Sequence, residues 1–298
     1  SNRGIIPAFI VMDVMRAANE RASSGEDVIH LEVGQPSSPA PLKVLEAAKS
    51  ALMDDKLGYT DALGNFSLRE KISSHYRKFY GLELDPRRII ITTGASGGLL
   101  LSFLSAFDAG DRVGLASPGY PAYKNMLTAL GISVLEIPVG DQSQFQLTLG
   151  TLESLSENID GLIITSPSNP TGSMISVPAM SDLVGWCDRS GVRLISDEIY
   201  HGIVYGEEAS TALSYGNDVI VINSFSKYFL MTGWRVGWLI CPDNLFESIK
   251  NLSPNLFVAP PTISQYVALS VLEEEKYLKK IGNCQLDYES PLNLHYYK

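Results

Sequence analysis

The chain has 298 residues, of which 45% are hydrophobic and 19% are charged, as is usual for a folded globular protein. Its formal net charge of −10 argues against non-specific nucleic-acid binding, which requires a basic surface. We expect no membrane span, no signal peptide and no metal site, because neither a long apolar run nor a metal-ligand spacing is present. The three widely spaced cysteines, Cys187, Cys241 and Cys284, favour reduced thiols and a cytoplasmic protein.

Short apolar runs alternate with longer amphipathic stretches along the chain. We predict strands at 89–92, 112–116, 133–138, 161–165, 192–196, 218–223 and 236–241. We predict helices at 42–53, 66–79, 96–107, 120–129, 177–190 and 244–251, and a helix-like run over 262–280. This alternation is typical of a three-layer α/β fold, in which helices cover both faces of a mostly parallel seven-stranded sheet.

Polar residues follow several of the predicted strands. Residues 93–98 link the first strand to a helix, where free backbone N–H groups suit a phosphate. Ser117-Pro118-Gly119-Tyr120 follows the second strand, and Asn169-Pro170 follows the fourth; both X-Pro bonds are candidates for the cis form. Open α/β sheets bind ligands at the carboxyl ends of their strands, so we expect these residues to share one site.

The most informative motif follows the sixth predicted strand. Ser224-Phe225-Ser226-Lys227 precedes Arg235 by eight residues, counted from the lysine. An ammonium is costly to bury, so Lys227 is a candidate for a depressed pKa and for a Schiff base. Serine hydroxyls and a guanidinium suit a phosphate, and Asp197, after the fifth strand, suits a protonated pyridine nitrogen. Together these residues predict pyridoxal 5′-phosphate (PLP) as the cofactor.

Three motifs in this order resemble those of the class I/II aminotransferases, which are fold-type I PLP enzymes. The resemblance extends from about residue 5 to residue 273, with 28 residues from Asn169 to Asp197 and 30 from Asp197 to Lys227. Each motif alone is weak, whereas their joint occurrence is specific. The motifs are Ser168-Asn169-Pro170-Thr171-Gly172, Ser196-Asp197-Glu198-Ile199-Tyr200, and Ser224-Phe225-Ser226-Lys227 with Arg235.

The resemblance implies catalytic roles for three residues. Lys227 would form the Schiff base and then shuttle a proton between the substrate Cα and the cofactor, while Asp197 would pair with the pyridinium. Tyr200 would hydrogen-bond the phenolate oxygen of the cofactor together with Asn169. Asn169 and Gly34 would also contact the substrate, Gly34 beside its carboxylate.

The resemblance also implies how the remaining cofactor contacts are made. Tyr120 would stack on the pyridine ring. Tyr59 would reach the phosphate of the neighbouring subunit, which implies a homodimer. The phosphate would be bound by Ala95, Ser96, Gly97, Ser224 and Arg235. We interpret His201 as a packed or surface histidine rather than an acid–base group, and Trp234 and Trp238 as core residues.

The implied activity is transfer of an amino group between an α-amino acid and a 2-oxo acid by a ping-pong mechanism. Two alternatives stay open. A PLP-dependent carbon–sulfur β-lyase, or a related lyase or synthase, would use the same cofactor. A non-catalytic PLP-sensing regulatory domain ranks lower, because no basic helix-turn-helix segment precedes residue 5.

We expect three segments along the chain. Residues 1–37 would form an N-terminal arm and a small-domain segment, and residues 38–262 the PLP-binding large domain. Residues 263–298 would begin a C-terminal small domain that is incomplete here. No arginine follows Arg235, so the residue that clamps the substrate carboxylate stays unassigned, and we expect further residues beyond those given.

Overall fold

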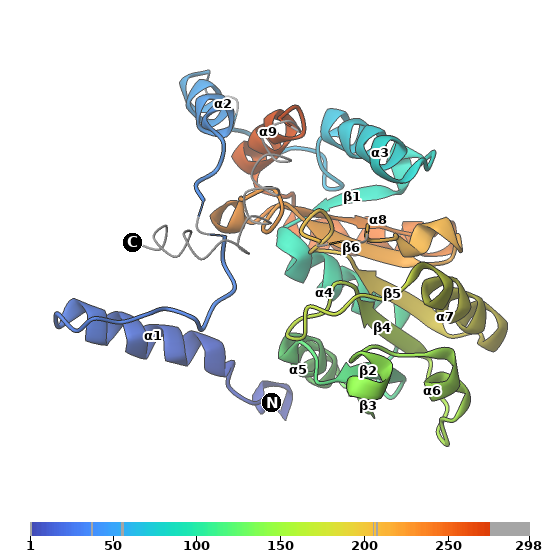
Figure 1. Ribbon diagram of the computed structural model, residues 1–298. Helices are drawn as coiled ribbons and strands as arrows, with labels where there is room; N and C mark the ends of the chain where they lie inside the picture. Colours follow the sequence, from blue (N-terminus) through green and yellow to red (C-terminus); the bar gives the residue numbers. More distant parts are fainter. Residues whose placement is uncertain (1, 37, 55–56, 205, 207, 275–298) are drawn as a thin grey trace.

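The computed structural model describes residues 2–274, apart from positions 37, 55, 56, 205 and 207. Its centre is a seven-stranded sheet in the order β1-β7-β6-β5-β4-β2-β3 (Figure 1). Strand β7 is antiparallel to its neighbours β1 and β6, and the other neighbours pair in parallel. The predicted mostly parallel sheet is therefore confirmed. The strands are β1 (Ile89–Thr92), β2 (Arg112–Ser117), β3 (Ser133–Pro138), β4 (Gly161–Thr165), β5 (Arg193–Asp197), β6 (Ile220–Ser224) and β7 (Gly237–Ile240).

Helices accompany the sheet throughout the described residues. All six predicted helices are present, but α8 continues past Pro254 instead of ending at residue 251. Helix α1 and the five-residue α6 are absent from the prediction. The run predicted over 262–280 is helical only to residue 271, and positions 275–280 lie outside the described residues. The helices are α1 (Ile10–Ser23), α2 (Leu42–Met53), α3 (Phe66–Tyr80), α4 (Gly94–Ala106), α5 (Pro121–Leu130), α6 (Leu149–Glu153), α7 (Val177–Ser190), α8 (Asp243–Phe257) and α9 (Thr262–Val271).

Capping residues set the ends of several helices. The Asn65 side chain accepts a hydrogen bond from the backbone at the start of α3, and Gly81 ends that helix with φ 68°. In α7, the Ser176 side chain accepts a hydrogen bond from the backbone at the start of the helix, and Gly191 ends the helix with φ 67°. Such caps satisfy backbone groups that have no partner inside the helix, and glycine adopts a positive φ without strain.

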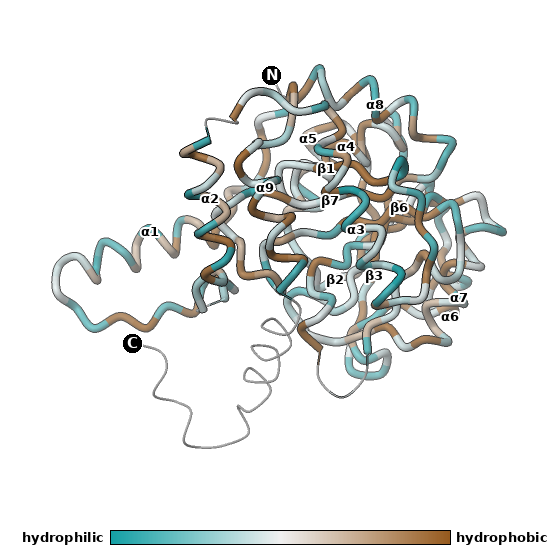
Figure 2. The backbone as a smooth tube through the Cα atoms, turned by 90° about the horizontal axis from the view of Figure 1, so that it is seen from above, coloured by the Kyte–Doolittle hydropathy of each residue, from teal (hydrophilic) through white to brown (hydrophobic). Residues whose placement is uncertain are grey.

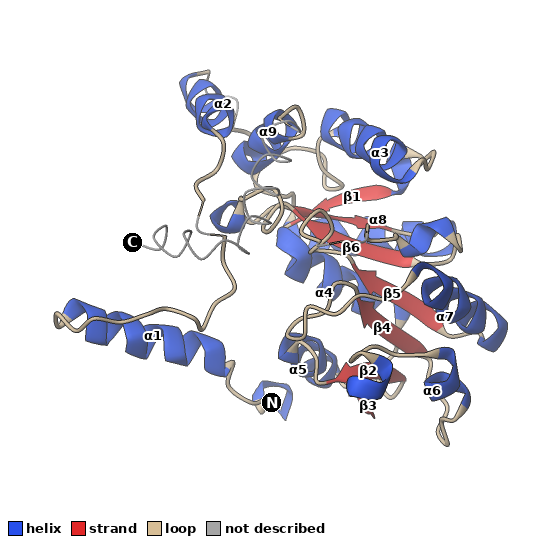
Figure 3. Ribbon diagram, in the orientation of Figure 1, coloured by secondary structure: helices blue, strands red, loops and turns tan. Residues whose placement is uncertain are grey.

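Each face of the sheet has its own hydrophobic core, because successive strand residues point to opposite faces. In β1, Ile89 and Ile91 join one core and Ile90 joins the other. Helices α2, α3, α7 and α9 pack on the first face, and α4, α5 and α8 on the second (Figure 3). In Figure 2 the hydrophobic stretches gather in the centre of the molecule, whereas α1, which has no buried residue, projects from it. The predicted three-layer arrangement is confirmed.

Candidate active site

The polar residues predicted to form a site gather at the carboxyl edge of the sheet. Asp197 is the last residue of β5, and Ser224 is the last residue of β6. Asn169 follows β4, and Tyr120 follows β2. Strand β1 leads at this same edge into α4, whose first turns contain Ala95, Ser96 and Gly97. Residues that are far apart in the sequence therefore meet because the strands that precede them end together.

Lys227 lies in the turn that follows β6. Its ammonium donates a hydrogen bond to the carbonyl oxygen of Gly34 and lies 5.9 Å from the centre of the Tyr200 ring. Burial, and next the positive charge of Arg235, lowers the pKa of Lys227. A lower pKa leaves more of the lysine unprotonated at neutral pH, and the unprotonated amine is the form that attacks a carbonyl or accepts a proton.

Asp197 is a buried carboxylate, with 4% of its surface exposed. The Tyr123 hydroxyl donates to its Oδ2 at 2.6 Å, and the Ile199 amide donates to its Oδ1 at 3.1 Å. Burial raises the pKa of Asp197 to about 6 despite these two donors. No cationic side chain among the described residues forms an ion pair with it. A buried carboxylate that has only neutral partners is suited to a cationic ligand group.

Asn169 and Tyr200, which are predicted to share one ligand oxygen, are in contact. The Asn169 side-chain amide donates to the Tyr200 hydroxyl at 3.3 Å. Burial, and next the charge of Asp197, raises the pKa of Tyr200, so its hydroxyl stays protonated and can donate to an anionic oxygen. Tyr120 precedes the first turn of α5, and its ring meets the Tyr123 ring edge-on with centroids 5.2 Å apart.

Arg235 forms a basic cradle with the start of α4. A Cβ atom on Gly94 would lie 2.5 Å from Arg235 Nη2, so only glycine lets the guanidinium approach this helix terminus. Arg235 Nη1 also donates to the Thr232 carbonyl at 2.9 Å and to Ser226 Oγ at 3.4 Å. The buried Ser224 hydroxyl lies 2.9 Å from that of Ser226. Hydroxyls, a guanidinium and helix N–H groups in one place suit a phosphate.

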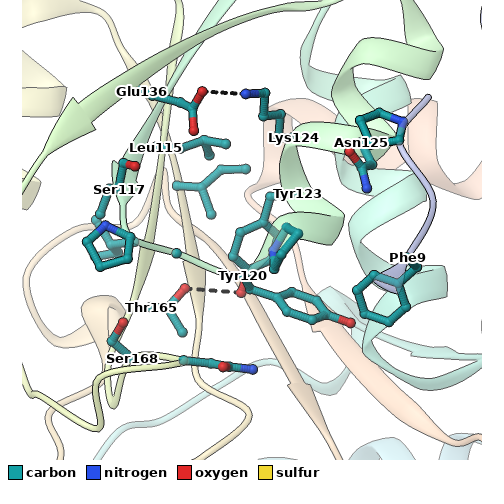
Figure 4. A pocket seen from close by; sticks show the side chains of 18 of the residues that line it. Phe9, Leu115, Ser117, Tyr120, Tyr123, Lys124, Asn125, Glu136, Thr165 and Ser168 are labelled. Carbon is teal, nitrogen blue, oxygen red and sulfur yellow. Dashed lines mark hydrogen bonds and ion pairs between the residues drawn. The ribbon is translucent and has the colours of Figure 1, made fainter. Parts of the chain in front are cut away.

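A cavity of about 410 Å³ adjoins Asn169 and Tyr120 (Figure 4). Its walls come from the ends of β2 and β4, the start of α5 and the N-terminal segment 7–11. Phe9 of that segment meets Tyr120 edge-on with centroids 6.0 Å apart. The only charged lining residues in the described part of the chain, Lys124 and Glu136, are paired with each other. The site thus has a largely apolar recess beside its aromatic residue.

One predicted site residue does not join this cluster, and two unpredicted residues do. Tyr59 is 88% exposed, and no described contact links it to the other site residues. Tyr123 and Thr165 are additional members, because the Tyr123 hydroxyl lies 3.1 Å from Thr165 Oγ1 as well as bonding Asp197. The position of Tyr123 three residues after Tyr120, on the same side of a helix, is the one sequence signal that could have indicated it.

His201 belongs to a buried structural network. Its Nδ1 lies 2.8 Å from the Tyr80 hydroxyl, and its Nε2 lies 2.9 Å from the Ser166 carbonyl oxygen. Burial lowers the pKa of His201 to about 4, so the ring is neutral at physiological pH. Its interpretation as a packed histidine is confirmed. Trp238 is fully buried as predicted, and Trp234 packs against the core from a partly exposed position.

Further sequence predictions concern cysteines, metals, membranes and prolines. Cys187 and Cys241 are buried free thiols, and Cys284 lies outside the described residues. Within the described ranges, no group of three or more His, Cys, Asp or Glu side chains is placed to hold a metal ion. The helices described here include none that is long and apolar enough to cross a membrane. The predicted cis bonds before Pro118 and Pro170 are present, with a third before Pro167.

Comparison with known proteins identifies the class to which this fold and site belong. The family "Aminotransferase class I and II" matches residues 26–284. The chain therefore belongs to this family, whose members use PLP, and it is an enzyme of the aminotransferase type.

Individual relatives agree with this assignment. The valine–pyruvate aminotransferase of Mycobacterium tuberculosis is 46% identical over 283 residues, which are 94% of this chain and 73% of the relative. A (5-formylfuran-3-yl)methyl phosphate transaminase of Methanocaldococcus jannaschii is 39% identical over 90% of this chain and 70% of its own length. The crystal structure of an aminotransferase from Mycobacterium tuberculosis matches with a TM-score of 0.92 and 45% identity, covering 96% of this chain and 74% of that one. The Thermus thermophilus aspartate aminotransferase with maleate matches with a TM-score of 0.91 and 26% identity, covering 96% and 76%.

Proposed function

We propose that this aminotransferase uses PLP to move an amino group between an α-amino acid and a 2-oxo acid, with Lys227 as the residue that carries the cofactor. The proposal rests on one observation: a buried carboxylate and a lysine with a lowered pKa both lie at the carboxyl edge of the sheet. Asp197 is a buried carboxylate without a cationic partner among the described residues, and Lys227 is a partly buried lysine with a lowered pKa. PLP contains a basic ring nitrogen for the first and an aldehyde for the second.

The side chains at this edge fit the remaining parts of the cofactor. Asp197 would pair with the ring nitrogen, Tyr120 would cover one face of the ring, and Tyr200 with Asn169 would hold the phenolic oxygen. The cradle between Arg235 and the start of α4 supports a phosphate site, because it is positive and leaves no room for a Cβ atom at Gly94. The phosphate-binding residues would be Ala95, Ser96, Gly97, Ser224 and Arg235.

When bound, the cofactor supplies an electron sink for the carbanion that forms at the substrate Cα. The protein supplies the base, the orientation and the binding energy. Lys227, whose pKa is lowered by burial and by Arg235, would accept the proton from the substrate Cα and deliver it to the C4′ carbon of the cofactor. Its contacts with the Gly34 carbonyl and the Tyr200 ring hold the amine at the edge of the sheet. Gly34 and Asn169 would in turn contact the substrate.

The substrates and the assembly can also be proposed. Valine and pyruvate are the first pair to test, because the relative that is 46% identical is named for them. We also propose a homodimer in which Tyr59 reaches the phosphate site of the second copy, which its 88% exposure supports. The buried free thiols of Cys187 and Cys241 support a reducing, cytoplasmic setting.

The absorption spectrum of the purified protein tests the proposal directly. Lysine-bound PLP should give a visible band, and an L-amino acid donor should convert it to the pyridoxamine form. Added pyruvate should then restore the band. The amino acid formed from pyruvate should equal the amount of pyridoxamine form that is converted back. Pyruvate and ammonia formed from a cysteine conjugate, without amino transfer, would instead identify a β-lyase. The absence of a band even after PLP is added would overturn the proposal.

A further inference from the structure

The Tyr123 hydroxyl is in direct contact with the Asp197 carboxylate. Tyr123 is 5% exposed and lies on α5, whereas Asp197 ends β5. The hydroxyl donates to Asp197 Oδ2 at 2.6 Å and lies 3.1 Å from Thr165 Oγ1, as Figure 4 shows for the second contact. The other carboxylate oxygen accepts from the Ile199 amide. Each oxygen of Asp197 thus has one protein donor, and only one of the two is a side chain.

The surroundings of Asp197 make this side-chain donor important. The titratable groups that sense its charge are Tyr120 and Tyr123 from α5, Tyr200 from the turn after β5, and the adjacent Glu198. All four are acids, so none of them offers a positive charge. Burial raises the pKa of Asp197 to about 6, and the bond from Tyr123 is the first of two effects that oppose this rise.

The hydrogen bonds have a defined direction. Burial, and next the charge of Asp197, raises the pKa of Tyr123 well above its ordinary value, so the phenol keeps its proton and donates it. Asp197 has both oxygens available as acceptors only while it is ionised. Thr165 opposes the rise in the pKa of Tyr123, as expected when its hydroxyl donates to the phenol oxygen. Thr165 thus donates to Tyr123, which donates to Asp197. Consecutive hydrogen bonds of this kind polarise one another, so the bond from Tyr123 to the carboxylate is strengthened.

We propose that Tyr123 is a positioning residue, whose hydroxyl keeps the Asp197 carboxylate ionised and aimed at the ring nitrogen of the cofactor, with Thr165 orienting that hydroxyl. The inference rests on the proposed function, because it assigns the ring nitrogen as the ligand of Asp197. It goes beyond that function by naming residues that never touch the ring nitrogen and yet set the state of the carboxylate.

A simpler role is that Tyr123 only fills space in the core of the second face, to which its ring belongs. Tyr123→Phe separates the two roles, because it keeps the ring and removes the oxygen. Tyr215→Phe is a matched control, since it removes a tyrosine hydroxyl that lies 2.9 Å from the neutral Ser210 hydroxyl instead of bonding a carboxylate.

The first measurement is thermal unfolding of the full chain after removal of the cofactor, at pH 5 and pH 8. At pH 8 Asp197 is ionised and needs its donor, so Tyr123→Phe should lower Tm by about 5 °C. At pH 5, below the pKa of about 6, the carboxyl is mostly protonated and the loss should be roughly half of this or less. Tyr215→Phe should lower Tm equally at both values. Equal losses for Tyr123→Phe at pH 5 and pH 8 would support simple packing and overturn the proposal.

The second measurement is the affinity for added PLP, followed by absorbance. Tyr123→Phe should weaken binding about tenfold, which is the typical effect of losing one hydrogen bond to a charged group. Thr165→Val leaves the tyrosine in place and should weaken binding in the same direction by a smaller factor, so the proposal stays testable if Tyr123→Phe does not fold. An unchanged affinity in both variants, with normal binding by the wild-type protein, would refute this inference alone. Failure of the wild-type protein to bind PLP would refute the proposed function itself.

Discussion

Asp197 and Glu198 are adjacent at the end of β5, and both are buried, but they belong to two different regions of the molecule. Asp197 lies at the site edge, where its two oxygens accept from Tyr123 and from a backbone amide. Glu198 lies in a closed polar cluster, where its Oε1 accepts from the Thr211 hydroxyl at 3.0 Å and the Ala212 amide at 2.9 Å. Its Oε2 has no hydrogen-bond partner among the residues that the structure describes. Burial raises the pKa of Asp197 to about 6 and that of Glu198 to about 7.

A raised pKa therefore does not by itself mark a functional carboxylate in this protein. Burial raises the pKa of Glu198 as it raises that of Asp197, yet the groups around Glu198 are parts of the protein core, including His201 at 3.6 Å. Asp197 differs because Tyr123, which bonds it, also lines the cavity beside the site. We therefore expect a binding carboxylate to be one that a ligand can reach, and a structural carboxylate to be one that a ligand cannot reach. The substitutions below test this difference between Asp197 and Glu198.

The largest effect should come from Lys227→Ala. This variant removes the amine that is proposed to hold the cofactor and to move the proton, so turnover should fall by about 10⁴-fold or more. Mass spectrometry after borohydride reduction should find no covalently bound PLP, while the far-ultraviolet circular dichroism stays unchanged. Lys250→Ala, at an exposed ion pair with Glu247, should behave like the wild-type protein. Substantial transamination by Lys227→Ala would show that another residue carries the cofactor.

The direct test of the comparison pairs Asp197→Asn with Glu198→Gln. Each substitution removes one negative charge and nearly conserves shape. Asp197→Asn should lower turnover about a hundredfold and weaken PLP binding, because the ring nitrogen loses its charged partner. Glu198→Gln should leave turnover and PLP affinity within about twofold of the wild-type values, as expected for a group that would touch neither the cofactor nor the substrate. Equal losses of activity in the two variants would mean that the two regions are not functionally distinct.

Much of this arrangement was predictable from the sequence. The strands buried on both faces are continuous apolar runs, and their ends, with the motifs around Asn169, Asp197 and Lys227, indicate the edge at which the site forms. The division of the chain into three segments, by contrast, stays a prediction. So do the ligand roles of the individual site residues.

The features that sequence could not supply depend on distant contacts. Tyr123 meets Asp197 across 74 residues, and no local pattern reports such a pair. Nor can a motif show that the Asp197 side chain lies at the site edge whereas the Glu198 side chain lies in a polar cluster of the core. Helix α1 was missed although its sequence is amphipathic, and the end of α8 was placed too early because the helix continues through Pro254.

A smaller effect on the site should follow from Gly94→Ala. Its Cβ atom would lie 2.5 Å from Arg235 Nη2, so the guanidinium must move away from α4 and PLP binding should weaken about tenfold. Gly81→Ala is the matched control, because Gly81 has φ 68° beside 66° for Gly94 but has no atom within 4 Å of the added Cβ. Both variants should lose about 1 kcal/mol of stability from the strained φ. A normal PLP affinity for Gly94→Ala would place the phosphate elsewhere.

The smallest effect on activity, and the sharpest on stability, should come from Glu198→Gln as a function of pH. The folded-state pKa of Glu198 is about 7, above its ordinary value of 4.5, so the folded protein retains this proton at pH values where the unfolded chain has lost it. Unfolding is therefore increasingly favoured as pH rises from about 4.5 to 7, and the ionised carboxylate costs at most about 3 kcal/mol above pH 7.

Glu198→Gln carries no such charge, so its Tm should match that of the wild-type protein at pH 5 and exceed it at pH 8. Asp197→Asn should show the same sign with a gain of similar size that is complete at a lower pH, because the pKa of Asp197 rises from 3.8 to about 6. If urea unfolding gives parallel pH profiles for wild type and Glu198→Gln, Glu198 is not an ionising buried group, and its contrast with Asp197 rests on location alone.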